Sequence, residues 1–215
     1  MENKTERQTE YRVLLKEAEG EIEEKKSRFI CSLRPVHTER EALEFIEATK
    51  KKYWDARHNC SAFVLGSRQE VTRCSDDGEP GGTAGRPMLE VLLGEGLCDV
   101  AAVVTRYFGG TLLGTGGLVR AYSGAVKEAL SSAQTGMMRC GVKLQIGADY
   151  NSVGKIQYIL GKRGTMPEAE YGESVCFRTI VKIGEAEALK KEIIEATNGK
   201  AVIEELEKIY FVDKG

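Results

Sequence analysis

The sequence predicts an α+β protein made of two domains, and three observations support this. A chain of 215 residues favours one large domain or two of about 100 residues. The segment 131–139 contains Ser, Gln, Thr and Gly without apolar periodicity, so we expect a linker there. Beyond it the patterns follow the order β-α-β-β-α-β, which is typical of a ferredoxin-like fold. The expected domains are therefore residues 1–134 and 139–215.

The first domain is expected to begin with a long strand and a helix. Residues 20–33 are predicted as one strand whose polar first half leads into an apolar second half. Thr38 and Glu41 have the spacing of a capping box, in which a hydroxyl and a carboxylate satisfy free amides of the first helical turn. The lysines at 50–52 fit the last turn of the same helix, where its dipole favours cations.

The remainder of the first domain contains a glycine-rich segment, because half of the 24 glycines fall between Gly78 and Gly124. The continuous apolar run 98–105 has the length of a central buried strand. The expected elements are two strands, a helix, a third strand, a loop and a second helix, at 60–66, 71–74, 83–93, 98–105, 106–116 and 117–133.

The second domain alternates strand and helix patterns. We expect strands at 142–146, 165–171, 175–181 and 201–212, and helices from Asn151, as the capping residue, and over 185–197. A ferredoxin-like domain is found in proteins of many functions, so this order by itself indicates none.

Composition excludes several classes of protein. Thirty-one basic against 33 acidic residues give a net charge of −2, which excludes a strongly basic chain and leaves room for a local basic face. The sequence shows no long apolar segment, so we expect no membrane association. Six cysteines without C-x-x-C spacing and two histidines predict no zinc site, and we expect neither a metal nor a cofactor. The charged N-terminal residues lack a signal sequence, which predicts a cytoplasmic protein with reduced thiols.

A glycine-rich phrase runs from Arg106 to Arg120 and lacks both the Walker lysine and the third glycine of a dinucleotide fingerprint. Its glycines at 114, 116 and 117 precede a predicted helix, whose free amides attract an anion such as phosphate. Arg106 and Arg120 could complete such a site, and Tyr107 and Phe108 offer faces on which a base can stack. The alternative is that the glycines allow close packing and the aromatic rings fill the core.

The acidic phrase at 75–87 contains Asp76, Asp77 and Glu79. These carboxylates could hold Mg²⁺, which takes oxygen ligands and bridges to phosphate. They could instead act as turn residues, or pair with an arginine at 73, 86 or 106.

His58 precedes Cys60 by two residues, which raises the question of a cysteine nucleophile with a histidine base. In a strand, positions i and i+2 are about 7 Å apart, beyond hydrogen-bond reach, so only Cys74 on a neighbouring strand remains as a candidate. We expect His58 instead to bond a carboxylate, that of Asp76 or Asp77.

Three phrases taken together resemble the IMPACT family, also called the YigZ family. They are His58-Asn59-Cys60, the acidic phrase, and Thr105 through Tyr122, and Lys26-Ser27-Arg28-Phe29 matches a further strand motif of that family. The match covers roughly residues 15–133, and the rest is similar to the family's bacterial C-terminal domain, described as ferredoxin-like and similar to a domain of elongation factor G. The resemblance implies a first domain of the ribosomal-protein S5 domain 2 type. It also implies an association with translation, because eukaryotic relatives are translation regulators.

The sequence as a whole predicts a non-enzymatic, translation-associated regulator that binds RNA or the ribosome. The alternatives are a magnesium-dependent enzyme acting on a phosphorylated small molecule and a purely protein-binding regulator. Residues expected to contact nucleic acid or phosphate are Lys26, Arg28, Arg106, Tyr107, Phe108, Gly114, Gly116, Gly117 and Arg120. Residues expected to form a polar cleft are His58, Asp76, Asp77, Glu79 and Arg86.

Overall fold

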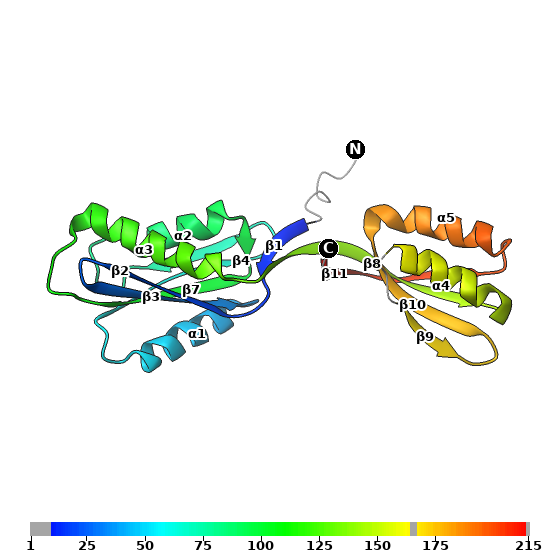
Figure 1. Ribbon diagram of the computed structural model, residues 1–215, viewed down its shortest axis with the longest axis horizontal. Helices are drawn as coiled ribbons and strands as arrows, with labels where there is room; N and C mark the ends of the chain where they lie inside the picture. The colour runs from blue at the N-terminus through cyan, green and yellow to red at the C-terminus, as the bar shows by residue number, and fades with distance from the viewer. Residues whose placement is uncertain (1–9, 164–166, 214–215) are drawn as a thin grey trace. The chain divides into compact units, whose positions relative to one another are not determined.

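The computed structural model describes residues 10–163 and 167–213 and divides the chain into two compact units (Figure 1). Unit 1 extends to Met137, and unit 2 comprises Met138–Asp213. The fold class is the α+β arrangement that the sequence predicts, so this expectation is confirmed. Among the described residues, no helix has the length and apolar character needed to cross a bilayer.

Unit 1 contains a five-stranded sheet with helices on both faces (Figure 1). The strand order is β2-β3-β7-β4-β5, and every pair of neighbours is antiparallel. β1 pairs in parallel with β6, and on its other side it neighbours β8 (Thr135–Ala148). The elements of this unit are β1 Glu10–Leu14, β2 Ala18–Glu24, β3 Ser27–Pro35, α1 Glu39–Lys52, β4 His58–Leu65, β5 Val71–Ser75, α2 Gly85–Gly94, β6 Leu97–Cys98, β7 Val100–Tyr107 and α3 Gly114–Ser131.

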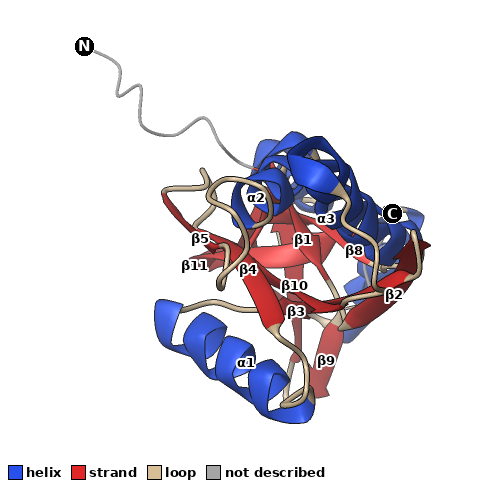
Figure 2. Cartoon of the chain, turned by 90° about the vertical axis from the view of Figure 1, so that its left-hand side faces the viewer, coloured by secondary structure: helices blue, strands red, loops and turns tan. Residues whose placement is uncertain are grey.

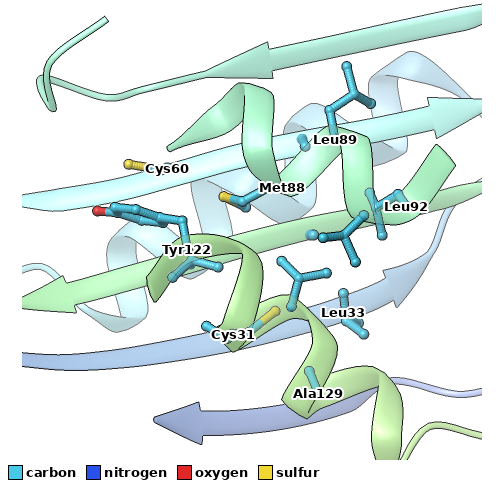
Figure 3. Close-up of a cluster of buried hydrophobic side chains, with 14 of the residues drawn as sticks. Cys31, Leu33, Cys60, Met88, Leu89, Leu92, Tyr122 and Ala129 are labelled. Atoms are coloured by element: carbon cyan, nitrogen blue, oxygen red, sulfur yellow. The ribbon is translucent and has the colours of Figure 1, made fainter. Parts of the chain in front are cut away.

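The main core of unit 1 lies between the sheet and helices α2 and α3. Figure 3 shows part of it, with Met88 and Leu92 of α2 packed beside Tyr122 and Ala129 of α3. A smaller cluster on the opposite face packs α1 against β4 and β7. The apolar residues of β7 are buried on both faces because this strand is central, as its continuous apolar sequence predicts.

The predicted single strand over residues 20–33 is wrong: the structure has a hairpin there. β2 ends at Glu24 and β3 begins at Ser27, and the two strands pair in antiparallel register. Lys25 and Lys26 form the turn with φ values of 49° and 66°, so both lie in the left-handed region. The sequence conceals this turn because two-residue turns of this kind normally contain Asn and Gly.

Relieving the strain of this turn is expected to stabilise unit 1. Changing Lys25→Asn together with Lys26→Gly should raise the free energy of unfolding by about 1 kcal/mol, since left-handed backbone costs a residue with a β-carbon that order of energy. The measurement is urea denaturation. Lys25→Ala with Lys26→Ala removes the same charges, keeps the strain and should give no such gain. Equal stability of the two double variants would contradict the strain.

Helix α1 begins almost as its sequence predicts. The Thr38 hydroxyl accepts a hydrogen bond from the Glu41 amide, 3.1 Å away. The Glu41 carboxylate accepts from the amide of His37, at 2.8 Å, and not from that of Thr38. Both bonds stabilise the helix start as a capping box would, with the return contact displaced by one residue.

Unit 2 has the predicted β-α-β-β-α-β order. Its strand order is β11-β8-β10-β9, and its core lies between this sheet and helices α4 and α5. The elements are β8 Thr135–Ala148, α4 Val153–Lys162, β9 Glu168–Tyr171, β10 Val175–Lys182, α5 Ala186–Ala196 and β11 Val202–Asp213, with short 3₁₀ turns at Tyr150–Ser152 and Ile183–Glu185.

Three local expectations change. The segment 131–139 is mostly regular, because β8 begins at Thr135 and runs from unit 1 into unit 2. Asn151 does not cap a helix: Asp149 caps the 3₁₀ turn before α4 by accepting from the Ser152 amide at 2.9 Å, and the N-cap of α4, Ser152, makes no side-chain cap bond. The strand predicted over residues 165–171 is described only from 167 onward, where β9 begins at Glu168, and Thr165 lies outside the described residues.

Candidate functional site

The sequence motifs meet at one end of the unit 1 sheet. The register pairs Arg28 of β3 with Tyr107 of β7, and His58 of β4 with Arg106. We define the loop end of unit 1 as the β2–β3 turn, the α1–β4 turn (residues 53–57), the acidic loop (76–84), the β7–α3 loop (108–113) and the first turns of α3. Figure 2 is a view onto this end, with the loops in tan.

Arg106 and Glu79 form a buried ion pair at the loop end. The Arg106 Nη1 atom donates to Glu79 Oε1 at 2.6 Å, and the side chains are 8% and 3% exposed. The Tyr122 hydroxyl donates to the same oxygen at 2.8 Å. Burial raises the pKa of the Tyr122 phenol, so the hydroxyl keeps its proton and remains a donor. The phosphate contact predicted for Arg106 therefore does not match its position, because the guanidinium is held inside unit 1 by a carboxylate.

Aromatic rings flank this arginine. The guanidinium carbon lies 5.5 Å from the ring centre of Phe29 and 5.5 Å from that of Phe108, both within cation–π range. Arg106 Nε is buried and has no hydrogen-bond partner among the described residues. The Phe108 ring, at which the sequence predicts base stacking or support of the loop, is half exposed and supports Arg106.

Asp76 caps helix α2. Its carboxylate accepts hydrogen bonds from the amides of Gly82 at 2.8 Å, Ala84 at 3.0 Å and Gly85 at 2.8 Å. Burial opposes ionisation, but the three amide bonds together outweigh it and hold the pKa of Asp76 below its ordinary value. The helix dipole favours an anion at the same position.

Asp77 joins α1 to β4. Its carboxylate accepts from the Asn59 amide at 2.7 Å and from Lys50 Nζ at 3.0 Å. His58 Nδ1 lies 2.9 Å from the main-chain oxygen of Asp77, so the histidine bonds a carbonyl and not the carboxylate that the sequence predicts. Lys50 therefore forms an ion pair with Asp77, in addition to the favourable interaction with the helix dipole that the sequence predicts.

Cys60 does not have the environment of a nucleophile. Its thiol donates to the Asp76 carbonyl, with 2.9 Å between sulfur and oxygen. Burial raises the pKa of Cys60 to about 12, and the nearby carboxylates add to this effect, so the thiolate is disfavoured at neutral pH. The remaining candidate, Cys74, pairs with Ala62, four positions along β4 from His58, so it too is out of hydrogen-bond reach of the imidazole.

Each carboxylate of the acidic phrase therefore has a partner within unit 1. Asp76 is engaged by amides, Asp77 by an amide and Lys50, and Glu79 by Arg106 and Tyr122. Within residues 10–163 and 167–213 no group of three or more His, Cys, Asp or Glu side chains is arranged to hold a metal ion. These three carboxylates consequently do not present a free acidic surface to a phosphate.

Two predicted site arginines are paired at the surface. Arg28 makes a two-point ion pair with Glu21, at 2.8 and 3.0 Å, and its guanidinium lies 5.9 Å from the ring centre of Tyr107. Arg86 pairs with Glu90, one turn along α2, and is not part of the polar cluster. Tyr107 itself donates its hydroxyl to Asp55 Oδ1 at 2.8 Å.

The glycines of the β7–α3 loop allow close approach at one position. A β-carbon on Gly109 would lie 2.0 Å from the carbonyl carbon of Lys26, so this loop packs directly on the β2–β3 turn. The Gly109 amide also donates to Ser27 Oγ at 3.1 Å. Helix α3 begins at Gly114 without a side-chain cap, three residues before the predicted start, so Gly116 lies in its first turn and not in the preceding loop.

Several cations at the loop end and in the last turn of α1 make no ion pair within the described ranges. They are exposed, and in the part of the chain that the structure describes no ion pair involves their side chains. Arg120 lies over the start of α3, since its Nη1 is 3.6 Å from a β-carbon built on Gly116. These residues are Lys25, Lys26, Lys51, Arg57 and Arg120. The sequence motifs indicate Lys26 and Arg120 but not the other three, although the lysine run at 50–52 was a signal for Lys51.

Comparison with known proteins matches a domain family in each of the two units. Residues 25–130 match the model of the Impact N-terminal domain, and residues 146–200 match a domain of unknown function, DUF1949. The IMPACT family member YvyE of Bacillus subtilis is 48% identical over 201 residues, 91% of each chain. The IMPACT family member YigZ of Escherichia coli is 36% identical over 178 residues, covering 81% of this chain and 87% of that protein.

A solved crystal structure of a hypothetical protein has a TM-score of 0.60 at 33% identity, covering 93% of this chain and 98% of the other. The fold and its motif-bearing end therefore define a protein with an Impact-type first domain followed by a DUF1949 domain. The chain belongs to the IMPACT family.

Proposed function

We propose that this protein is a non-enzymatic, cytoplasmic, translation-associated regulator, and that the loop end of unit 1 binds structured RNA, free or in the ribosome. The observation that carries this proposal is the distribution of charge at that end. The carboxylates of the acidic phrase are each engaged by amides, a hydroxyl or a cation, whereas Lys26 and Arg120 are exposed and make no ion pair among the described residues. Phosphate contacts from such cations supply most of the sequence-independent affinity for nucleic acids.

The uncapped start of α3 adds to this surface. The first amides of α3 have no side-chain acceptor at the N-cap. Because the helix has 18 residues, the positive end of its dipole adds to the attraction for an RNA phosphate at this position. Membership of the IMPACT family agrees with a role in translation, and the engaged acidic side chains give no support to the magnesium-dependent alternative.

The test measures RNA affinity against salt concentration. The native chain should bind a labelled RNA hairpin at low salt, as seen by fluorescence anisotropy. Lys26→Ala with Arg120→Ala should weaken binding and flatten the slope of log affinity against log salt by about 0.7–0.9 for each phosphate that the variant no longer neutralises. Arg106 is kept intact because its removal would disturb the buried pair.

The matched control is Arg40→Ala. Arg40 is an exposed arginine at the start of α1, where the chain leaves the opposite end of β3. This variant should leave both affinity and slope unchanged. Absence of any RNA binding by the native chain at low salt would refute the proposed function, and equal weakening in the control would show that the effect is not local.

A further inference from the structure

Trp54 is the chain's single tryptophan, and most of its surface is exposed to solvent. Its side chain is 82% exposed, the highest value among the large apolar side chains that the structure describes. An indole usually buries most of its surface, and rings left on the surface commonly serve as contact residues. None of the sequence motifs includes this residue.

The turn that carries Trp54 is fixed on both sides. The Tyr53 amide donates to the Thr49 carbonyl at 3.0 Å, and the Ala56 amide donates to the Tyr53 carbonyl at 3.0 Å. Asp55 Oδ1 accepts from the Tyr107 hydroxyl at 2.8 Å, which ties the turn to β7. The exposed ring therefore extends from a turn whose backbone is fixed by hydrogen bonds, so a ligand that stacks on the ring does not have to order the turn.

Cations precede and follow Trp54 in the chain, and the acidic side chain next to it, that of Asp55, is bonded to Tyr107. Lys51 and Arg57 stand three residues before and three after Trp54, and both are exposed and free of ion pairs among the described residues. Lys52 Nζ lies 4.8 Å from the ring centre of Tyr53 and pairs with Glu19. An aromatic face flanked by unpaired cations matches a base with a phosphate on either side.

We propose that Trp54 is a stacking platform for an unpaired nucleobase of RNA, with Lys51 and Arg57 on the flanking phosphates. This inference rests on the proposed function and deepens it, because it requires an unstacked base next to the phosphates held at the loop end. A duplex, whose bases are already stacked on one another, cannot use the platform.

The experiment uses the fluorescence of Trp54 itself. The full chain is titrated with an unstructured ribo-oligonucleotide of about 12 nucleotides, a length within the site size of single-strand binders. Stacking should quench the indole emission as the RNA saturates the protein. Trp54→Ala should lower affinity about 10-fold, measured by anisotropy of a labelled oligonucleotide, and Trp54→Phe should retain most of it.

Controls separate stacking from charge and from the absence of RNA binding altogether. Tyr158→Ala removes an aromatic side chain of unit 2 that is 71% exposed, and it should bind as the native chain does. Inorganic polyphosphate should not quench Trp54, and equal quenching by it would overturn stacking. RNA binding without quenching and without weakening in Trp54→Ala refutes the platform but leaves the proposed function intact. No RNA binding at all refutes both and leaves a protein as the occupant of this surface.

Discussion

Replacing Arg106 by methionine is expected to lower the free energy of unfolding by about 3–5 kcal/mol, the usual cost of leaving one member of a buried ion pair without its partner. The carboxylate of Glu79 is 3% exposed and would retain only the Tyr122 hydroxyl. Urea denaturation of the full chain measures this decrease. A cost below about 1 kcal/mol would contradict the pairing.

A double-mutant cycle separates the ion pair from packing of the arginine stem. Combining Arg106→Met with Glu79→Gln should cost less than the sum of the two single changes, because the amide is neutral. Additive single effects would oppose the ion pair.

Changing Asp76→Ala is expected to cost about 2–3 kcal/mol, because two amides at the start of α2 and that of Gly82 in the acidic loop lose a charged acceptor. Asp76→Asn is the milder comparison, since the side-chain oxygen can still accept. Thermal or urea denaturation measures both. Because RNA contacts are assigned to other residues, Asp76→Asn should retain the affinity of the native chain for RNA.

The stability that Asp76 contributes should depend on pH in a definite direction. The pKa of Asp76 is lower in the folded chain than its ordinary value, so its contribution is complete at neutral pH. That contribution is lost as the pH falls through the ordinary aspartate value towards the lower folded value. The difference in stability between the native chain and Asp76→Asn should therefore shrink in acid. A constant difference down to low pH would show that the carboxylate charge does not matter.

The elements that sequence predicted well have strong periodic or compositional signals. The apolar run of β7 and the alternating strands of unit 2 are recognisable because their side chains face a core on one or both sides. The β2–β3 turn was missed because its strain is a property of tertiary pairing, and two lysines carry none of the usual turn chemistry. The start of β8 was missed for a similar reason, since residues 135–140 pair without a buried apolar face.

The sequence predicted that the motifs lie at strand ends, but it did not predict which of their side chains contact one another. The motifs identified the correct strand ends, and the antiparallel register then brought Arg28, Arg106 and His58 together. The sequence offered Arg106 as one of three arginines that could pair with the acidic phrase, but spacing could not select it or its partner Glu79, because the pair is separated by 27 positions and depends on how the acidic loop folds back. Exposure of Trp54 was equally hidden, since a sequence does not show which aromatic rings remain without neighbours.

The packing of Gly109 on Lys26 sets a limit on how the loop end can respond to a partner. With main chain against main chain and the Gly109 amide bonded to Ser27, the hairpin tip and the start of the β7–α3 loop are held against each other. A molecule that docks there meets a surface whose conformational entropy was already given up on folding, so its affinity is not reduced by ordering either loop.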